Sequence, residues 1–347
     1  MDRMKHLIRK GKWVLEVKKA RTWTRGPLRE DRILLLDPSL GTGNRGDQII
    51  AGYAALQLRD IFPGREFISI PTQCLPSREE RELLLQYRYK ILCGTNLMTS
   101  YYERFSNWKM PEDLKGYQDI LTLGVGWGSY ADTISRTSGF VYRTVLSGKG
   151  LHSVRDSYTQ EKFYRMGIRN VVNTGCPTLW KLTRDHCGAI PEKKASRVVA
   201  AVTDYAPAPE ADRKMLRLLK ECYNEVYVWI QGSGDASYLK KLEETDGLTV
   251  IGDGVDAFTQ VLDSGDIDYV GTRLHAGIHA LNRGVRSIIL SVDNRAVEMG
   301  RDFGLPILPR REDTLPLKEM IENPLPSEIR IPEEQIRIWK EQFKEHR

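Results

Sequence analysis

Short apolar runs alternate with stretches of helical hydrophobic spacing along most of this chain. Arg32–Leu36 is the first strand-sized run, and a helix is expected from about Asp47 to Ile61. The apolar face of that helix comprises Ile50, Tyr53, Ala54, Leu58 and Ile61. Further strands are expected in the first half at Glu66–Ile70, Lys90–Cys93, Ile120–Leu123, Leu151–Val154 and Asn170–Asn173.

A second alternation follows the polar stretch Leu182–Ala195, which contains Gly188 and Pro191 and is the best candidate for a linker. Its strands are expected at Val198–Val202, Val226–Ile230, Leu248–Ile251, Ile267–Val270 and Ser287–Val292. Its helices are expected near residues 209–222, 236–244, 256–264, 275–283 and 295–303. Alternation of this kind favours parallel sheets with helices on both faces.

The two alternating stretches predict two α/β domains. The expected organisation is a segment 1–28, an N-terminal domain 29–185, a C-terminal domain 195–310 and a tail 311–347. The tail ends in a helix with Ile336, Trp339 and Phe343 on one face, which we expect to pack back on the body. Open parallel sheets bind ligands at the carboxyl ends of their strands, so the residues just after strands are the candidates for function.

Composition excludes several classes of protein. The chain has 347 residues, of which 41% are hydrophobic and 28% charged, as in an ordinary folded protein. No window approaches the roughly 18 consecutive apolar residues that span a bilayer. The five cysteines show no CxxC spacing, so neither a disulfide framework nor a zinc knuckle is indicated, and a reducing cytosol is expected.

The net charge of +6 is concentrated at the start of the chain. Residues 1–30 hold ten Lys/Arg and three acids, a net +7, and the remainder carries −1. A nucleic-acid binder that uses its whole surface is therefore not expected. The apolar stretch Trp13–Leu15 is too short for a secretory signal, so the segment is interpreted as a basic arm.

A glycine-rich loop, Gly41-Thr42-Gly43-Asn44-Arg45-Gly46, lies between the first strand and the first helix. Its GxGxxG pattern is also found at dinucleotide sites, but no acid follows the second strand to hold a ribose. Asp47 would also repel a pyrophosphate. A glycine turn needed only for geometry is one alternative. In another, Asn44 and Asp47 accept hydrogen bonds from sugar hydroxyls.

Arg273 and His275 follow the strand expected at Ile267–Val270 and open a helix. An arginine at a helix start is a natural anion ligand, and a histidine beside it is a candidate acid or base near pH 7. Alternatively, Arg273 pairs with a nearby acid and His275 caps the helix. His279 lies one turn later, but Ala276 replaces the glutamate of the zinc motif, so we expect His279 to pack against the sheet.

Arg155 ends another expected strand, and Asp156 or Ser157 is expected to cap the helix that follows. Pairing of Arg155 with Asp156 or with another acid, and no further role, is the alternative. An arginine at the end of a strand has the same potential to bind an anion as Arg273.

Taken together, these elements resemble the polysaccharide pyruvyl transferases over most of residues 31–310. The matching motifs are Gly43–Asp47, Ser153–Ser157, Gly175–Thr178 and Arg273–His275 followed by Ile278, Ala280 and Gly284. The resemblance implies an α/β fold of two facing Rossmann-like domains, similar to GT-B glycosyltransferases. It also implies a pyruvyltransferase that moves the enolpyruvyl-derived group of phosphoenolpyruvate onto two sugar hydroxyls, forming a cyclic ketal in surface or capsular polysaccharide biosynthesis.

The resemblance maps the family's RLH element onto Arg273, Leu274 and His275 and its mid-chain arginine onto Arg155, and the remaining roles are expected from the residues themselves. His275 is the expected catalytic acid/base, and Asn44 and Asp47 are expected at the acceptor. The expected donor-binding residues are Arg273, Leu274, Arg155 and Arg295. No metal and no cofactor beyond the co-substrate phosphoenolpyruvate are expected. Two departures from the family pattern are Cys93–Asn96, where a glycine run is common, and Arg295, where a lysine is common.

Two other functions stay open at this point. A GT-B glycosyltransferase using a nucleotide sugar would need a ribose-directed acid, for which Asp235 and Asp256 are candidates. A non-catalytic glycan- or membrane-docking protein on the same fold is the other alternative. The expected localisation is cytoplasmic, with residues 1–28 either solvated or docked on the anionic inner face of the plasma membrane, where a lipid-linked acceptor would lie.

Overall fold

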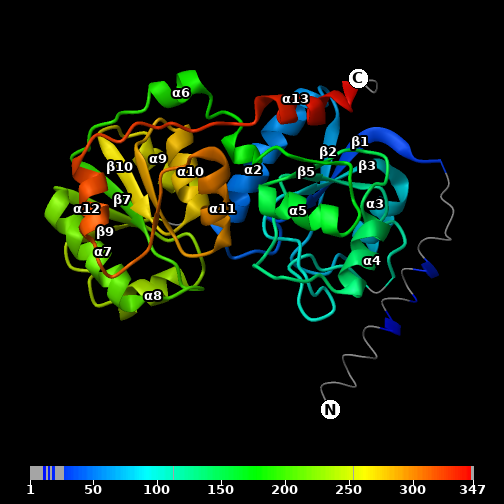
Figure 1. Cartoon of the computed structure of the whole chain (residues 1–347), viewed down its shortest axis with the longest axis horizontal. Coiled ribbons are helices and arrows are strands. Elements are labelled where there is room, and N and C mark those ends of the chain that lie inside the picture. The colour runs from blue at the N-terminus through cyan, green and yellow to red at the C-terminus, as the bar shows by residue number, and fades with distance from the viewer. Residues whose placement is uncertain are drawn as a thin grey trace, which may run out of the picture. The chain divides into compact units, whose positions relative to one another are not determined.

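The computed structural model describes residues 11, 12, 15, 18, 19, 27–111, 113–252 and 254–344 (Figure 1). The chain forms two compact units. Unit 1 comprises residues 1–42, 50–177 and 332–347, and unit 2 comprises residues 43–49 and 178–331. Most of the expected basic segment 1–28 lies outside the described residues. Within the described part of the chain, no helix is both long and apolar enough to cross a membrane.

Unit 1 is built on a parallel sheet with the strand order β2-β1-β3-β4 and a neighbouring parallel pair, β5-β6. Its strands are β1 (Arg29–Asp37), β2 (Glu66–Pro71), β3 (Tyr87–Cys93), β4 (Ile120–Leu123), β5 (His152–Val154) and β6 (Val171–Asn173). A bridge between Val125 and Val154 links the pair to the chain that follows β4. Leu34, Leu36 and Leu92 are fully buried in the core, which explains why these strands read as apolar runs.

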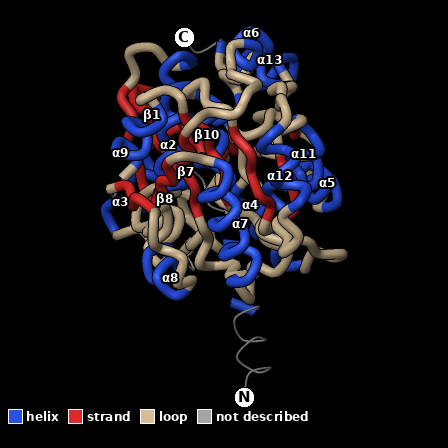
Figure 2. The backbone as a smooth tube through the Cα atoms, turned by 90° about the vertical axis from the view of Figure 1, so that its left-hand side faces the viewer, coloured by secondary structure: helices blue, strands red, loops and turns tan. Residues whose placement is uncertain are grey.

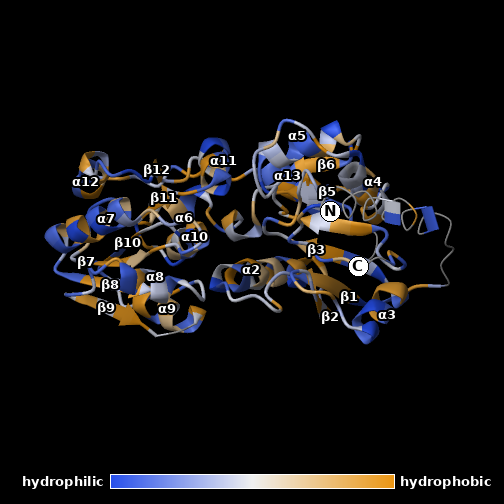
Figure 3. Ribbon diagram, turned by 90° about the horizontal axis from the view of Figure 1, so that it is seen from below, coloured by the Kyte–Doolittle hydropathy of each residue, from blue (hydrophilic) through white to orange (hydrophobic). Residues whose placement is uncertain are grey.

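The helices of unit 1 cover its sheet. They are α2 (Arg45–Ile61), α3 (Arg78–Gln86), α4 (Arg136–Val145), α5 (Ser157–Arg165) and α13 (Glu333–Glu341). The expected apolar face of α2 is buried at Ile50, Ala54, Leu58 and Ile61, while Tyr53 is half-buried. Asp156 caps α5 by accepting a hydrogen bond from the amide of Thr159 at 2.7 Å, as predicted. Figure 3 shows orange strands beside helices that carry both colours.

The C-terminal helix α13 packs within unit 1, and the expectation that the tail folds back is confirmed. Trp339 and Phe343 are buried, and the Phe343 ring meets that of Phe62 edge-on at 5.0 Å. The Gln342 side chain accepts from the Leu151 amide at 2.8 Å and donates to its carbonyl at 3.0 Å. These paired bonds hold the helix beside the start of β5.

Unit 2 contains a six-stranded parallel sheet with the order β12-β11-β10-β7-β8-β9. Its strands are β7 (Arg197–Ala201), β8 (Glu225–Trp229), β9 (Leu248–Ile251), β10 (Ile267–Gly271), β11 (Ser287–Ser291) and β12 (Ile307–Pro309). Counted along the chain from β7, this is the order 3-2-1-4-5-6 of a Rossmann fold, read from the β9 edge. Several of these strands are labelled in Figure 2. The direction of winding reverses between β7 and β10, and this is where such folds bind ligands.

Side chains alternate between the two faces of the unit 2 sheet. Val226 and Val228 join a buried cluster with helix α7 (Pro209–Cys222), whereas the Trp229 ring stacks on Phe258 of α9 (Val255–Leu262) at 4.1 Å on the other side. The helices are α6 (Arg184–Gly188), α7 (Pro209–Cys222), α8 (Asp235–Lys241), α9 (Val255–Leu262), α10 (Leu274–Asn282), α11 (Asn294–Phe303) and α12 (Leu315–Glu322). Both faces are covered, as the apolar strands predicted.

The two units divide the chain differently from the expected domains. The expected first domain ran to residue 185, whereas unit 2 already begins at Thr178 and also includes residues 311–331. The proposed linker Leu182–Ala195 therefore lies inside unit 2, where it contains α6. The segment Gly43–Ile49, which includes the first residues of α2, also belongs to unit 2, because its backbone is hydrogen-bonded there.

Two buried histidines make stability depend on pH. Burial lowers the pKa of His152 and of His279 to about 4. Because an unfolded histidine titrates near 6.5, the unfolded state binds more protons between pH 6.5 and 4, and stability falls as the pH falls through that window. We predict that His152→Phe removes part of this loss, up to about 2 kcal/mol at pH 5. Urea unfolding at pH 7.5 and pH 5 measures it, and equal losses in variant and wild type would contradict it.

Candidate functional site

The reversal of winding in unit 2 brings together the residues that follow β7 and β10. The Thr272 amide donates to the Ala201 carbonyl at 2.9 Å, and the Thr272 hydroxyl donates to Thr203 at 2.8 Å. A side chain on Gly271 would collide with the Ala201 backbone, so glycine permits this close approach. The loops that follow the two strands therefore leave the sheet side by side.

Arg273 is buried at this point and is the N-cap of α10. Its backbone carbonyl accepts a hydrogen bond from the Tyr269 hydroxyl at 2.8 Å. Its guanidinium pairs with both carboxylate oxygens of Asp235, with Asp204 at 3.0 Å, and with the Val202 carbonyl at 3.2 Å. The structure therefore contains the pairing of Arg273 with a nearby acid that the sequence left as an alternative.

Asp235 opens α8 and is fully buried. Besides Arg273, it accepts hydrogen bonds from the backbone amides of Gly232 at 2.7 Å and Asp204 at 3.1 Å. Burial raises the pKa of Asp235, and Arg273 opposes that rise. Asp235 is thus engaged in the fold and is not available to a ribose, while the other candidate, Asp256, is exposed on α9.

Leu274 and His275 form the first turn of α10, and both are buried. His279 lies one turn further, where its Nε2 is 2.9 Å from the Thr259 hydroxyl. With its pKa lowered by burial, His279 is neutral at pH 7, and its observed partners are Thr259 and Phe258 of helix α9, whereas the sequence predicted packing against the sheet. Across the described ranges, no cluster of three or more His, Cys, Asp or Glu is arranged to hold a metal ion.

Arg295 lies in the first turn of α11, close to a second carboxylate. Asp293 caps this helix, accepts from the Arg295 amide at 3.0 Å and pairs with its guanidinium. Burial alone would lower the pKa of Arg295, but the charge of Asp293, its hydrogen bond and the charge of Asp47 outweigh this effect and raise the pKa. Arg295 therefore carries its charge next to bound carboxylates, as Arg273 does.

Asn44 and Asp47 belong to the segment Gly43–Ile49, which is part of unit 2. The Arg45 amide donates to the Gln231 carbonyl at 2.9 Å, and the Gln231 side-chain amide donates to Asn44 Oδ1 at 2.8 Å. The same Asn44 oxygen accepts from the Gly46 amide at 3.0 Å. Asn44 Oδ1 thus fixes the loop to the residues after β8, and Asp47 is buried beside it.

Four residues at this edge were not singled out from the sequence. Asp204 and Tyr205 follow β7, Gln231 follows β8 and Asp293 follows β11. All four are polar residues within a few positions after an expected strand. The sequence shows this feature, but it does not distinguish these four from other polar residues at such positions. Their roles depend on partners that are distant in the chain.

Arg155 belongs to unit 1, directly after β5. It is 1% exposed and donates from Nε to Asp156 at 3.1 Å. Its Nη1 and Nη2 atoms are buried without a hydrogen-bond partner among the described residues. Gly126 lies directly beside the guanidinium of Arg155, and a Cβ atom at position 126 would overlap this group. Two unpaired donors on a buried charge are costly, so Arg155 is suited to an anion.

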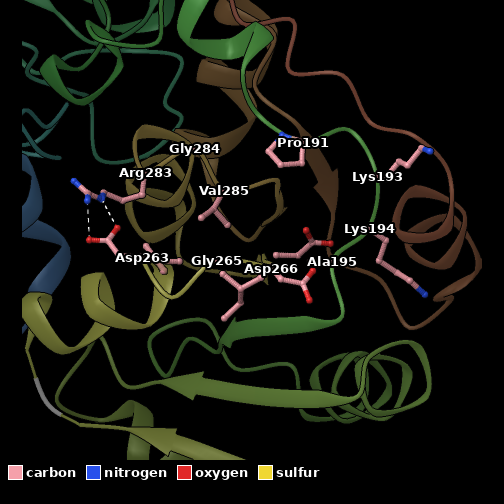
Figure 4. Close-up of a pocket in the computed structure, with 13 residues that line it drawn as sticks. Pro191, Lys193, Lys194, Ala195, Asp263, Gly265, Asp266, Arg283, Gly284 and Val285 are labelled. Atoms are coloured by element: carbon pink, nitrogen blue, oxygen red, sulfur yellow. Dashed lines mark hydrogen bonds and ion pairs between the residues drawn. The ribbon is translucent and has the colours of Figure 1, made fainter.

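A pocket of about 530 Å³ lies at the amino ends of the strands of the unit 2 sheet, opposite to the residues described above (Figure 4). Its carboxylates already have partners: Asp263 pairs with Arg283, Asp266 with Ser196 and Asp268 with Arg286. Parallel α/β sheets bind ligands at the carboxyl ends of their strands, whereas this pocket lies at the amino ends of β10 and β11. We therefore place the candidate site at the carboxyl ends of the strands of unit 2.

Comparison with known proteins gives a family and a fold. A family model described as polysaccharide pyruvyl transferase matches residues 44–294. No curated protein matches the chain significantly. Among solved structures, UDP-GlcNAc 2-epimerase of Methanocaldococcus jannaschii, in complex with UDP-GlcNAc and UDP, aligns with a TM-score of 0.52 and 12% identity. That alignment covers 88% of this chain and 98% of the epimerase.

Two further structures align less well. They are the S. aureus MnaA–UDP structure (TM-score 0.45, 11% identity, 85% of this chain and 92% of that one) and a variant of the wall teichoic acid polymerase TagF (0.45, 10%, 99% and 90%). The alignment with the epimerase shows a GT-B-like fold, as expected from the sequence. At 12% identity it carries no information about activity.

A substitution at Gly232 tests how firmly Arg273 is held. A Cβ at this position would overlap Arg273 Nη2, which cannot move away because Asp235 and Asp204 bind it. We predict that Gly232→Ala lowers the free energy of unfolding by about 1–3 kcal/mol. Gly188→Ala is the matched control, because its Cβ would meet no heavy atom within 4 Å. Equal urea midpoints for the two variants would show that Arg273 is free to move.

Proposed function

Because the chain belongs to the polysaccharide pyruvyl transferase family, we propose that it transfers the enolpyruvyl-derived group of phosphoenolpyruvate to two hydroxyls of a sugar. The product would be a cyclic pyruvate ketal in surface or capsular polysaccharide biosynthesis. One observation carries the proposal: at the reversal of winding in unit 2, Arg273, His275 and Arg295 all stand at the starts of helices.

The proposed donor carries a phosphate and a carboxylate, so its recognition needs several cationic donors. Arg273 and Arg295 each use Nε and Nη2 in the hydrogen bonds already described. We propose that the Nη1 atom of each arginine binds the ligand. Leu274 lies between Arg273 and His275 in the chain, and we propose that its side chain contacts the apolar part of the donor.

Asp204 is the carboxylate that an incoming anion would displace from Arg273. Its side chain is 36% exposed, whereas that of Asp235 is fully buried and held by two backbone amides. Exchange of one carboxylate for another keeps Arg273 paired throughout, which avoids the cost of an isolated buried charge.

Arg155 supports an anion site in unit 1 by a separate argument. Its buried guanidinium has two nitrogens with no partner in the described residues, and a phosphate or carboxylate oxygen would satisfy them. We propose that Arg155 also binds the donor.

The proposed reaction begins with protonation of the C3 methylene of phosphoenolpyruvate, which makes C2 electrophilic. One sugar hydroxyl attacks C2 and loses its proton. The C2–O bond to phosphate then breaks, phosphate leaves with the bonding electrons, and a second hydroxyl attacks C2, loses its proton and closes the ring. We assign the proton transfers to His275 as general acid/base and the stabilisation of the departing phosphate to the arginines. The chemistry requires neither a metal nor a further cofactor.

The acceptor is proposed to approach the Gly43–Ile49 segment. Asp47 offers a carboxylate there, and Asn44 offers its side-chain amide group. Asn44 Oδ1 already accepts two hydrogen bonds and Asn44 Nδ2 donates to Asp47 Oδ2 at 3.4 Å, so a sugar hydroxyl would join an existing hydrogen-bond network. A lipid-linked sugar as acceptor remains part of this proposal.

Loss of His275 or Arg273 should abolish most of the activity. We predict that His275→Ala and Arg273→Ala each lower kcat/KM for phosphate release from phosphoenolpyruvate plus acceptor by about 10²-fold or more. Galactose-, mannose- and lipid-linked acceptors would be screened by mass spectrometry for the added pyruvyl mass. Arg283→Ala is the matched control, because Arg283 pairs with Asp263 at the opposite edge of the sheet.

Full phosphate release by both site variants would contradict the residue assignment. Thermal-shift measurements on the wild type test the donor itself: stabilisation by UDP-sugars and not by phosphoenolpyruvate would favour a glycosyltransferase instead. Acceptor binding without turnover would favour a non-catalytic docking protein.

The basic segment 1–28 leads to a separate proposal, peripheral binding to the inner face of the membrane. Each Lys or Arg near an anionic surface contributes about 1 kcal/mol, and salt screens this attraction. We predict that the full chain binds anionic vesicles at low salt and is released by about 0.5 M NaCl. Sedimentation with vesicles measures the binding, and equal binding by a chain lacking residues 1–28 would rule out a role for this segment.

A further inference from the structure

Tyr205 contacts both of the arginines proposed for the donor site. It follows β7 in unit 2, where the direction of winding reverses. The Cζ atom of Arg273 lies 5.0 Å from the centre of its ring, and the Cζ atom of Arg295 lies 5.4 Å from it. Both distances are within the range in which a guanidinium is attracted to the electron-rich face of an aromatic ring.

The hydroxyl of Tyr205 adds a polar link to the same group. It donates to Asp293 Oδ2 at 3.0 Å and accepts a hydrogen bond from Arg295 Nη2. Asp293 in turn caps α11 and pairs with Arg295. The phenol end is thereby anchored to the start of α11, while half of the residue's surface remains exposed.

The two arginines are otherwise held by different parts of unit 2. Arg273 is fixed by Asp204 and Asp235, which follow β7 and β8, and Arg295 is fixed by Asp293, which follows β11. Two guanidinium groups repel each other, and an element that attracts both would link these two separate sets of contacts. Tyr205 supplies that element through its ring and its hydroxyl.

We propose that Tyr205 is a positioning residue that sets the spacing of Arg273 and Arg295, so that one small dianionic or trianionic ligand meets both. The inference rests on the proposed function, in which that ligand is phosphoenolpyruvate. Because Tyr205 acts on the guanidinium groups and not on the reacting atoms, its loss should weaken donor binding more than it slows the chemical step.

The experiment compares Tyr205→Leu and Tyr205→Phe in the full-length chain. Leucine removes both ring contacts and the hydroxyl, and we expect the KM for phosphoenolpyruvate to rise about 5- to 30-fold with a smaller change in kcat. Phenylalanine keeps the ring, and the rise should be about 2- to 5-fold. Tyr223→Phe is the matched control, because its hydroxyl donates to Asp268 at 2.8 Å at the amino end of β10.

A purely structural role would give a different result. It would lower the melting temperature and kcat together and leave the KM unchanged, and either an unchanged KM in Tyr205→Leu or an equal KM rise in Tyr223→Phe would overturn the inference.

A second measurement does not depend on the proposed reaction. Phenylglyoxal modifies accessible arginines, and peptide mass spectrometry gives the rate at Arg295, with Arg283 as internal reference. We expect Tyr205→Leu to raise the Arg295 rate relative to Arg283, and an unchanged ratio would overturn the inference. If the wild type does not use phosphoenolpyruvate at all, the proposed donor is wrong, and this ratio still decides whether Tyr205 holds the arginine.

Discussion

The buried ion pair between Arg273 and Asp235 is the interaction on which the organisation of the candidate site depends. It joins the residue that caps α10 to the residue that opens α8, and Asp235 also binds the amides of Gly232 and Asp204. Three loops that leave the sheet after β7, β8 and β10 are therefore tied to one pair of charges. Removing one partner of such a pair typically costs about 3–5 kcal/mol, because the other charge is left buried and uncompensated. The pair is weak evidence for stability as such, but it fixes the direction in which α10 presents His275.

The same pair is part of a larger group of charges at the carboxyl ends of the unit 2 strands. Asp204, Asp235 and Asp293 face Arg273 and Arg295, so the carboxylates outnumber the guanidinium groups. The net charge of these five groups is negative, so an anion that binds here gains little from their overall charge. It must instead displace a carboxylate or use the remaining guanidinium nitrogens. Specificity would then come from geometry, because only a ligand whose acidic groups match the fixed spacing of the arginines can replace Asp204 without leaving a charge unpaired.

Much of the fold could be predicted from the sequence, because its strands are buried on both faces and read as apolar runs. The expected strand at Leu248–Ile251 and the helix at residues 209–222 have the observed bounds. Helix α4 was missed because its sequence, RTSGFVYRTV, combines glycine with β-branched and aromatic residues, which have low helix propensity. Helix α3 was missed although Ser77 and Glu80 form a capping box, a signal that the sequence contained.

The site was only partly predictable, for a different physical reason. Arg273, His275 and Arg155 could be found because they stand next to expected strand ends, but the partners of Arg273 come from positions 38 and 69 residues away. Periodicity reports which face of an element is buried and contains no information on which loops meet. The placement of residues 43–49 in unit 2 is a further example, since it depends on backbone hydrogen bonds to residues 231–233.

Arg155 and Arg273 both follow a strand, but the protein satisfies their hydrogen-bond donors to different extents. Arg273 has every donor except Nη1 engaged by the protein, whereas Arg155 shares only Nε with Asp156 and keeps both Nη atoms buried without a partner within the described chain. A buried, half-satisfied guanidinium is unfavourable unless something else is gained. Asp156 cannot satisfy it, since its other oxygen accepts from Thr159 as the cap of α5. Asp156 therefore forms a buried ion pair with Arg155 through one oxygen only, and the two remaining Nη atoms are the ones that we propose bind an anion.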